Sequence, residues 1–157
     1  MKQIEVVTPI LIVKYEELSV DDRRLVDEAR KAFIHAYAPY SKFKVGAAIA
    51  LDNEKIVAGS NQENVAYPSG MCAERSACYY AHSQFPDAKF CAIAIAACKV
   101  DGKEVVKPIS PCGNCRQALL EYEMLAKNDV RVILASDDDI YILPSVKSLL
   151  PLSFVEF

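Results

Sequence analysis

Three cysteines in two groups constrain the fold of this chain more than any other feature. Cys72 stands alone, while Cys112 and Cys115 lie three residues apart much further along the sequence. Each group falls at the predicted start of a helix. If one metal ion binds all three thiolates, the chain must fold back so that the two helix N-termini face each other.

The residues around these cysteines are typical of a zinc site that activates water. Catalytic zinc takes three protein ligands and leaves a fourth position for water. Glu74 lies two residues after Cys72, close enough to reach that water without being a ligand. A Cys or His, one residue, Glu, and a later Pro-Cys-x-x-Cys form the signature of zinc deaminases. We therefore predict a zinc hydrolase, with Cys72, Cys112 and Cys115 as ligands and Glu74 as the proton carrier.

Three thiolates give the zinc unit a net charge of −1, which opposes the acidification of its water. The positive ends of two helix dipoles would offset part of this charge. Arg75 adjoins Glu74 and can offer N–H donors to the sulfurs. We expect Arg75 to support the metal site in this way.

Other interpretations of the cysteines stay open at this point. A Cys-x-x-Cys pair also serves thiol oxidoreductases, in which Cys112 and Cys115 would be free of metal. A non-catalytic zinc module would require a fourth protein ligand, and neither His35 nor His82 lies in a motif that supports this role. The remaining cysteines, 78, 91 and 98, are expected to pack as buried thiols.

Charge and hydropathy narrow the classes of partner. The 157-residue chain has a net charge of −3, whereas nucleic-acid binders usually carry a basic stripe. No apolar run is long enough to span a membrane, and the N-terminus lacks a signal-peptide pattern. We therefore expect the protein to be located in the cytoplasm, where thiols stay reduced.

Hydrophobic periodicity predicts helices alternating with strands. The expected helices cover residues 19–38, 71–82, 112–127 and 145–150, with Pro39 ending the first. The expected strands cover 45–51 and 55–58, joined as a hairpin, and then 90–98, 130–135 and 140–143. This order predicts an α/β fold in one domain, residues 1–157. It would be a three-layer α-β-α sandwich around a mixed, mostly five-stranded sheet.

Four blocks of the sequence resemble the small homotetrameric cytidine deaminases. They span residues 38–47, 61–68, 71–77 and 110–117, and the ending 149–154 is also similar to that family. The resemblance implies the cytidine deaminase fold, one zinc ion per subunit and a homotetramer whose active sites are shared between subunits. It implies hydrolytic deamination of cytidine or deoxycytidine in pyrimidine salvage, with Glu74 moving the protons.

The resemblance also implies roles for substrate-binding residues. Asn61 and Glu63 would bind the ribose hydroxyls, and Phe43 would pack near the pyrimidine. The Ala73 N–H and the Ser110 carbonyl would bind the base. Phe154, with Phe157 as an alternative, would reach into a neighbouring subunit and stack on the base. Deaminases of aminonucleoside antibiotics such as blasticidin S share the zinc motifs, but the ribose-binding pair favours a nucleoside.

Overall fold

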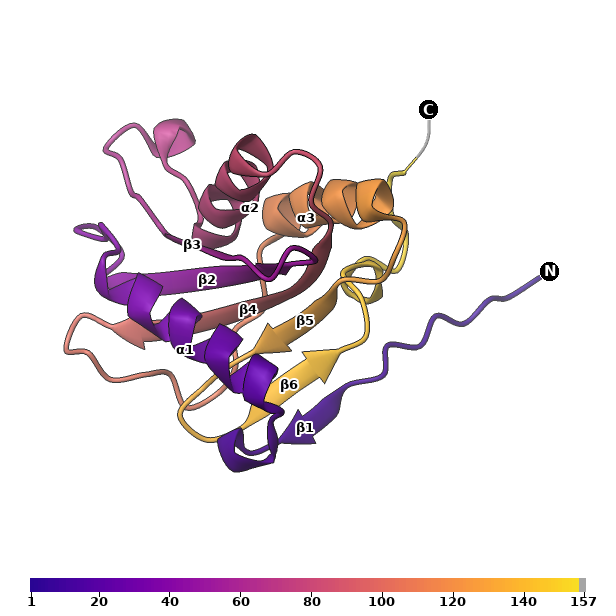
Figure 1. The fold of residues 1–157 in the computed structure, drawn as a ribbon, viewed down its shortest axis with the longest axis horizontal. Helices are drawn as coiled ribbons and strands as arrows, with labels where there is room; N and C mark the ends of the chain where they lie inside the picture. Colours follow the sequence, from indigo (N-terminus) through magenta and orange to yellow (C-terminus); the bar gives the residue numbers. More distant parts are fainter. Residues whose placement is uncertain (156–157) are drawn as a thin grey trace.

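The computed structural model describes residues 1–155, which form one mixed sheet with helices on both faces (Figure 1). No helix in this part of the chain is long and apolar enough to cross a membrane. In chain order, the elements are β1 (Leu11–Val13), η1 (Tyr15–Glu17), α1 (Val20–Ile34), β2 (Phe43–Leu51), β3 (Ile56–Ser60), η2 (Tyr67–Ser69), α2 (Ala73–Gln84), β4 (Phe90–Lys99), α3 (Gly113–Ala126), β5 (Arg131–Leu134), β6 (Ile140–Leu143) and η3 (Lys147–Leu149), where η marks a 3₁₀ turn.

The sheet has the strand order β1-β6-β5-β4-β2-β3. β4 and β5 are parallel and connected through α3, and the other neighbouring pairs within residues 1–155 are antiparallel. The mixed three-layer prediction is therefore confirmed. The sheet has six strands rather than mostly five, because the short β1 pairs with Ile140–Ile142 at one edge.

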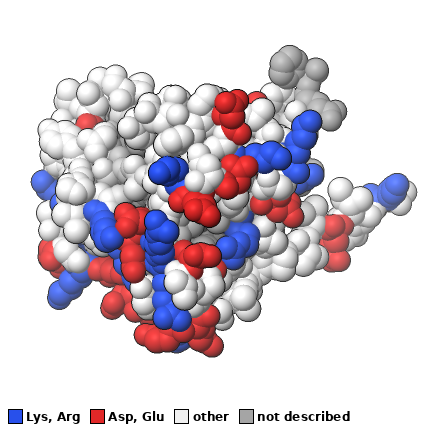
Figure 2. Space-filling view, viewed as in Figure 1, with Lys and Arg blue, Asp and Glu red and all other residues white. Residues whose placement is uncertain are grey.

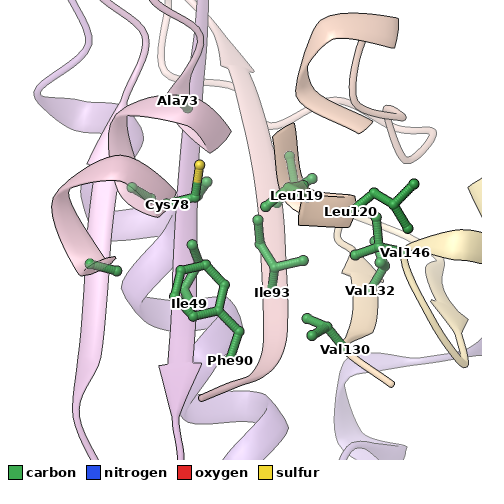
Figure 3. Close-up of a cluster of buried hydrophobic side chains, with 14 of the residues drawn as sticks. Ile49, Ala73, Cys78, Phe90, Ile93, Leu119, Leu120, Val130, Val132 and Val146 are labelled. Carbon is green, nitrogen blue, oxygen red and sulfur yellow. The ribbon is translucent and has the colours of Figure 1, made fainter. Parts of the chain in front are cut away.

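The two faces of the sheet differ in side-chain size. Successive strand residues point to opposite faces, and on β4 the isoleucines 93 and 95 face α2 and α3, whereas the alanines 92, 94 and 96 face α1. Figure 3 shows the isoleucine side, where Ile49 and Ile93 belong to one buried cluster with Leu119 of α3. The larger side chains thus form the core under the two helices that carry the cysteines.

Three local predictions are corrected by the structure. The helix expected at residues 145–150 is only the 3₁₀ turn η3 at Lys147–Leu149. α1 begins after the N-cap Ser19 as expected, but it ends at Ile34 rather than near residue 38. The reason is a tertiary contact, since the Tyr37 backbone bonds to Asn61 O and Glu63 N instead of continuing the helix. Cys91 is only half-buried, whereas the other two expected packing cysteines, 78 and 98, are buried.

Candidate metal centre and active-site cavity

The two cysteine groups occupy the N-termini of neighbouring helices. Cys72 is the N-cap of α2 and Cys112 is the N-cap of α3, and neither sulfur caps its own helix. Cys115 lies in the first turn of α3 and is buried. α2 and α3 pack against each other, so the three sulfurs lie within 4.8 Å of one another. The structure brings together all three predicted ligands.

The sulfur separations match those of a tetrahedral zinc site. A Zn–S bond of about 2.3 Å places two tetrahedral sulfurs about 3.8 Å apart. The distance from Cys72 Sγ to Cys112 Sγ is 3.9 Å, and from Cys112 Sγ to Cys115 Sγ it is 3.5 Å. Cys112 is exposed and Cys72 half-buried, so the group of sulfurs is not sealed from solvent.

The pKa values of two neighbouring thiols are shifted in opposite directions, and a bound divalent cation would relieve this opposition. The pKa of Cys72 is lowered to about 5, first by the neighbouring Cys115 thiol and then by Arg75. The pKa of Cys115 is raised, because its thiol donates to the Cys72 sulfur and is buried. Without a metal ion, one ionised sulfur thus suppresses ionisation of the next. A bound cation would remove that conflict, since thiolates are the ligands.

Arg75 lies beside the sulfurs, as expected for a supporting role. Its Nη2 donates to Cys72 Sγ at 3.9 Å. Its Nε is buried and has no hydrogen-bond partner within residues 1–155. The pKa of Arg75 is raised above its usual value, mainly by the Cys72 sulfur. The guanidinium is therefore charged at every relevant pH and is directed at the ligand set.

Glu74 is a buried acid in the first turn of α2. It is only 4% exposed, and burial raises the pKa of its carboxyl group, with the charge of Cys72 acting in the same direction. A carboxyl group with a raised pKa holds a proton more readily near neutral pH, which is what a proton carrier needs.

A cavity of about 500 Å³ adjoins the metal centre. It contains two of the predicted substrate residues, Asn61 and Glu63, together with Cys72 and Arg75. The full lining is Tyr40, Ser41, Asn61, Gln62, Glu63, Asn64, Tyr67, Gly70, Met71, Cys72 and Arg75. A predicted metal ligand and the predicted sugar-binding pair thus line the same cavity.

Both members of that pair also bind the protein backbone. The Asn61 side chain accepts from Val45 N at 2.8 Å and donates to Phe43 O at 3.0 Å. The Glu63 carboxylate accepts from Tyr40 N and from the backbone and hydroxyl of Ser41. An ionised carboxylate has about four acceptor positions, so Glu63 retains capacity for a ligand hydroxyl.

Glu74, Cys112 and Cys115 are not part of this lining, and four other residues predicted to bind substrate also lie outside it. Ala73 is the buried first residue of α2, and Phe43 is the half-buried first residue of β2. Ser110 is exposed two residues before Cys112. Phe154 is 66% exposed, and its carbonyl accepts from Gln117 Nε2 at 2.8 Å. The alternative Phe157 lies outside the described residues.

Sequence reasoning assigned no role to three prominent residues of the lining. The rings of Tyr40 and Tyr67 meet edge to face at 6.4 Å, and Met71 immediately precedes the ligand Cys72. The tyrosines come from segments far apart in the chain, and no spacing rule brings them together. Only their presence in the blocks at 38–47 and 61–68 that resemble the cytidine deaminases could have drawn attention to them.

The fold and the three-cysteine site together define a zinc-binding deaminase. Over residues 19–128 the sequence matches the family described as the cytidine and deoxycytidylate deaminase zinc-binding region. The chain belongs to this family of zinc-dependent hydrolases. One zinc ion per chain fits both the family and the cysteine cluster.

Within that family, the chain is similar to cytidine deaminases. The enzyme of Halalkalibacterium halodurans is 37% identical over 136 residues, covering 86% of this chain and 95% of that protein. A Mycobacterium tuberculosis relative is 41% identical over 115 residues, covering 71% and 81%. The crystal structure of cytidine deaminase from Burkholderia pseudomallei has a TM-score of 0.69 at 34% identity, covering 87% of this chain and all of that one (100%).

Proposed function

We propose that this chain deaminates cytidine and deoxycytidine to uridine and deoxyuridine, with release of ammonia, in pyrimidine salvage. The observation that carries the proposal is the shared cavity, in which Cys72 and the pair Asn61 and Glu63 line the same 500 Å³. Ligand sites of small molecules have volumes of about 300–1,000 Å³. A nucleoside could place its base at the metal and its sugar at the pair.

The proton transfers are assigned to Glu74. Zinc held by the three sulfurs would supply a Lewis acid and a water whose pKa is lowered toward neutrality. The Glu74 carboxylate would accept one proton of the attacking water as its oxygen bonds to C4 and would pass that proton to N3 of the ring. It would then move the proton of the new C4 hydroxyl to the amino group, so that the C4–N bond breaks, ammonia leaves and the C4 carbonyl of uridine forms. Its raised pKa suits both acceptance and return of the proton. Arg75 would offset the negative charge of the sulfurs.

The remaining residues would hold the nucleoside. Asn61 and Glu63 would bind the sugar hydroxyls, and their backbone contacts fix both side chains before substrate arrives. The Ala73 N–H lies at the positive end of α2, where it could bind the base carbonyl. The Ser110 carbonyl would accept from the amino group, and Phe43 would pack against the ring.

We further propose a homotetramer in which Phe154 completes the site of a neighbouring subunit. The surface over η2 and α2 shows few charges, whereas charges gather around α1 (Figure 2). Apolar and aromatic side chains are exposed on these segments, including Val65, Tyr67, Tyr79 and Tyr80. An exposed apolar surface of this kind supports the proposal of a subunit interface. Phe154 is exposed within its own subunit and is therefore accessible to another.

A small nucleoside suits the cavity better than a nucleic acid strand or a membrane. Strand-binding channels carry several cations along the phosphate path, whereas the described lining has Arg75 as its cation, and this donates to Cys72. Zinc binding by three thiolates also requires reduced cysteines, and all six are free thiols. This requirement supports action in the reducing cytoplasm.

A substrate panel tests the proposal. The zinc-loaded protein is assayed for ammonia release from cytidine, deoxycytidine, cytosine, adenosine and blasticidin S. We expect release from the two cytosine nucleosides. Release from blasticidin S alone would assign the site to an antibiotic deaminase, and absence of release from both cytosine nucleosides would refute the proposal. Metal analysis should give one zinc per chain, whereas a thiol oxidoreductase would hold none.

A further inference from the structure

Arg116 makes three hydrogen bonds at the base of the metal centre. It follows Cys115 on α3, and its Nε donates to Pro111 O at 2.8 Å. Its Nη2 donates to Ser110 Oγ and its Nη1 to Leu149 O, both at 2.9 Å. The guanidinium thus connects two segments that are about 40 residues apart in the sequence.

The first of these segments presents a metal ligand. Pro111 directly precedes Cys112, which is exposed and has no side-chain hydrogen bond that would fix it as a helix cap. Pro111 has no backbone N–H of its own to anchor the turn. The bonds from Arg116 to the Pro111 carbonyl and the Ser110 hydroxyl therefore fix the backbone immediately before Cys112.

The second segment is the C-terminal part of the chain. Leu149 ends the turn η3, whose start is held by α3 through the buried Glu123, which accepts from Val146 N and Lys147 N. Further along, Gln117 donates to Phe154 O. Side chains of α3 therefore hydrogen-bond to the C-terminal segment at several points. Arg116 bonds both to this segment and to the loop that precedes Cys112.

We propose that Arg116 is a positioning residue that locks the loop at residues 110–112 and the C-terminal segment to α3, so that the Cys112 sulfur is held in place for the metal. The proposal rests on the zinc site of the proposed function and does not depend on the substrate. Bonding to these three acceptors at once requires the planar guanidinium group, whose N–H donors point in fixed directions. A lysine ammonium group could not replace it here.

Arg116→Met tests the proposal, because it keeps the aliphatic stem and removes every donor. Arg23→Met is the matched control, since Arg23 likewise donates to two backbone carbonyls, Leu18 O and Glu16 O, at the other side of the fold. Zinc affinity is measured by competition with a chromophoric chelator, without nucleoside. Amide exchange is followed over residues 146–154. We expect Arg116→Met to weaken zinc binding by about tenfold and to accelerate exchange, and Arg23→Met to change neither.

Zinc affinity in Arg116→Met equal to that of the control would overturn the proposal, and weaker zinc binding without faster exchange would overturn the coupling to the C-terminal segment. If Arg116→Met does not fold, Arg116→Lys and Ser110→Ala remove fewer contacts. Wild-type zinc affinity and exchange in Arg116→Lys would equally contradict the role. Because no nucleoside is present, failure of the deaminase assignment leaves this result unaffected.

Discussion

At the scale of single residues, the hydrogen bonds of Glu63 determine both the state of its carboxylate and the shape of one wall of the cavity. Its carboxylate accepts from Tyr40 N at 2.9 Å and from Ser41 N at 3.2 Å, as well as from the Ser41 hydroxyl. The Ser41 hydroxyl is the main cause of the lowered pKa of Glu63. The carboxylate is thus kept ionised and fixed in direction, and the same bonds hold the turn that forms one wall of the cavity.

Ser41→Ala should raise the pKa of Glu63 toward its ordinary value of 4.5. A carboxyl group with a depressed folded-state pKa stabilises the fold above its unfolded pKa, and this stability is lost as the pH falls through the folded-state pKa. The variant should therefore unfold at a higher pH during acid titration. The side-chain carboxyl signal in an NMR titration measures the shift directly. Ser83→Ala, which removes an exposed hydroxyl bonded to Tyr80 O, serves as the control, and an unchanged Glu63 pKa in Ser41→Ala would contradict the account.

At the scale of elements, the contact between α1 and the sheet depends on small residues. Gly46 of β2 lies beneath α1 so closely that a Cβ atom would stand 2.0 Å from Ala29 O and 2.5 Å from Phe33 N. Both neighbours are backbone atoms, so a side chain could not rotate out of the way. The alanines at 92, 94 and 96 continue the same face on β4. Small side chains set the distance between this helix and the sheet.

Gly46→Ala should lower the free energy of unfolding by about 2 kcal/mol or more, because α1 must move off the sheet. Urea denaturation measures the loss. Gly113→Ala is the control, since nothing lies within 4 Å of the position its Cβ would take, and it should change stability by about 0.5 kcal/mol or less. Equal stabilities of the two variants would show that α1 does not pack as closely as described.

The sequence predicted most elements because their signals are local. α2 and α3 begin one residue after cysteines that the zinc motif had placed at helix starts, and β6 has the bounds 140–143 that its apolar run predicts. β1 was missed because three residues are too short for a periodic pattern. The end of α1 was misplaced because the Tyr37 backbone pairs with the segment at 61–63, a long-range contact.

The candidate site, like the fold, was predictable from the sequence only in part. The ligand set follows from the zinc signature, and the structure brings these three sulfurs together. The aromatic part of the cavity was not predictable, because Tyr40 and Tyr67 meet only after two distant segments fold together. The contact of Arg116 with Leu149 was missed for the same reason, since the two residues lie 33 positions apart.

At the scale of the whole molecule, the charge distribution is uneven. Charged side chains gather around α1, and the surface over η2 and α2 shows few of them (Figure 2). The C-terminal segment exposes Leu152, at 86%, and Phe154, at 66%, beyond the body of the fold. These exposed apolar groups are expected to be covered in a tetramer.

Phe154→Ala should weaken assembly and raise KM for the nucleoside. The backbone bond from Gln117 to residue 154 is retained in the variant, so the loss is confined to the ring. Loss of a stacked aromatic ring costs about 1–3 kcal/mol, which corresponds to a KM increase of roughly 5- to 150-fold. Sedimentation velocity and steady-state kinetics measure both effects, with Val20→Ala as the control, since Val20 is an exposed apolar residue on α1, away from the C-terminal segment. Wild-type assembly and KM in Phe154→Ala would remove Phe154 from the site.

The most direct test of the central claim compares cytidine turnover by the wild-type protein and Glu74→Gln at equal zinc content. The amide has the shape of the carboxylate but cannot carry the proton, so we expect Glu74→Gln to bind one zinc per chain and to lose at least about 10²-fold in kcat. Wild-type turnover by the zinc-loaded variant would contradict the assignment of Glu74 as the proton carrier and, with it, the mechanism proposed for this site.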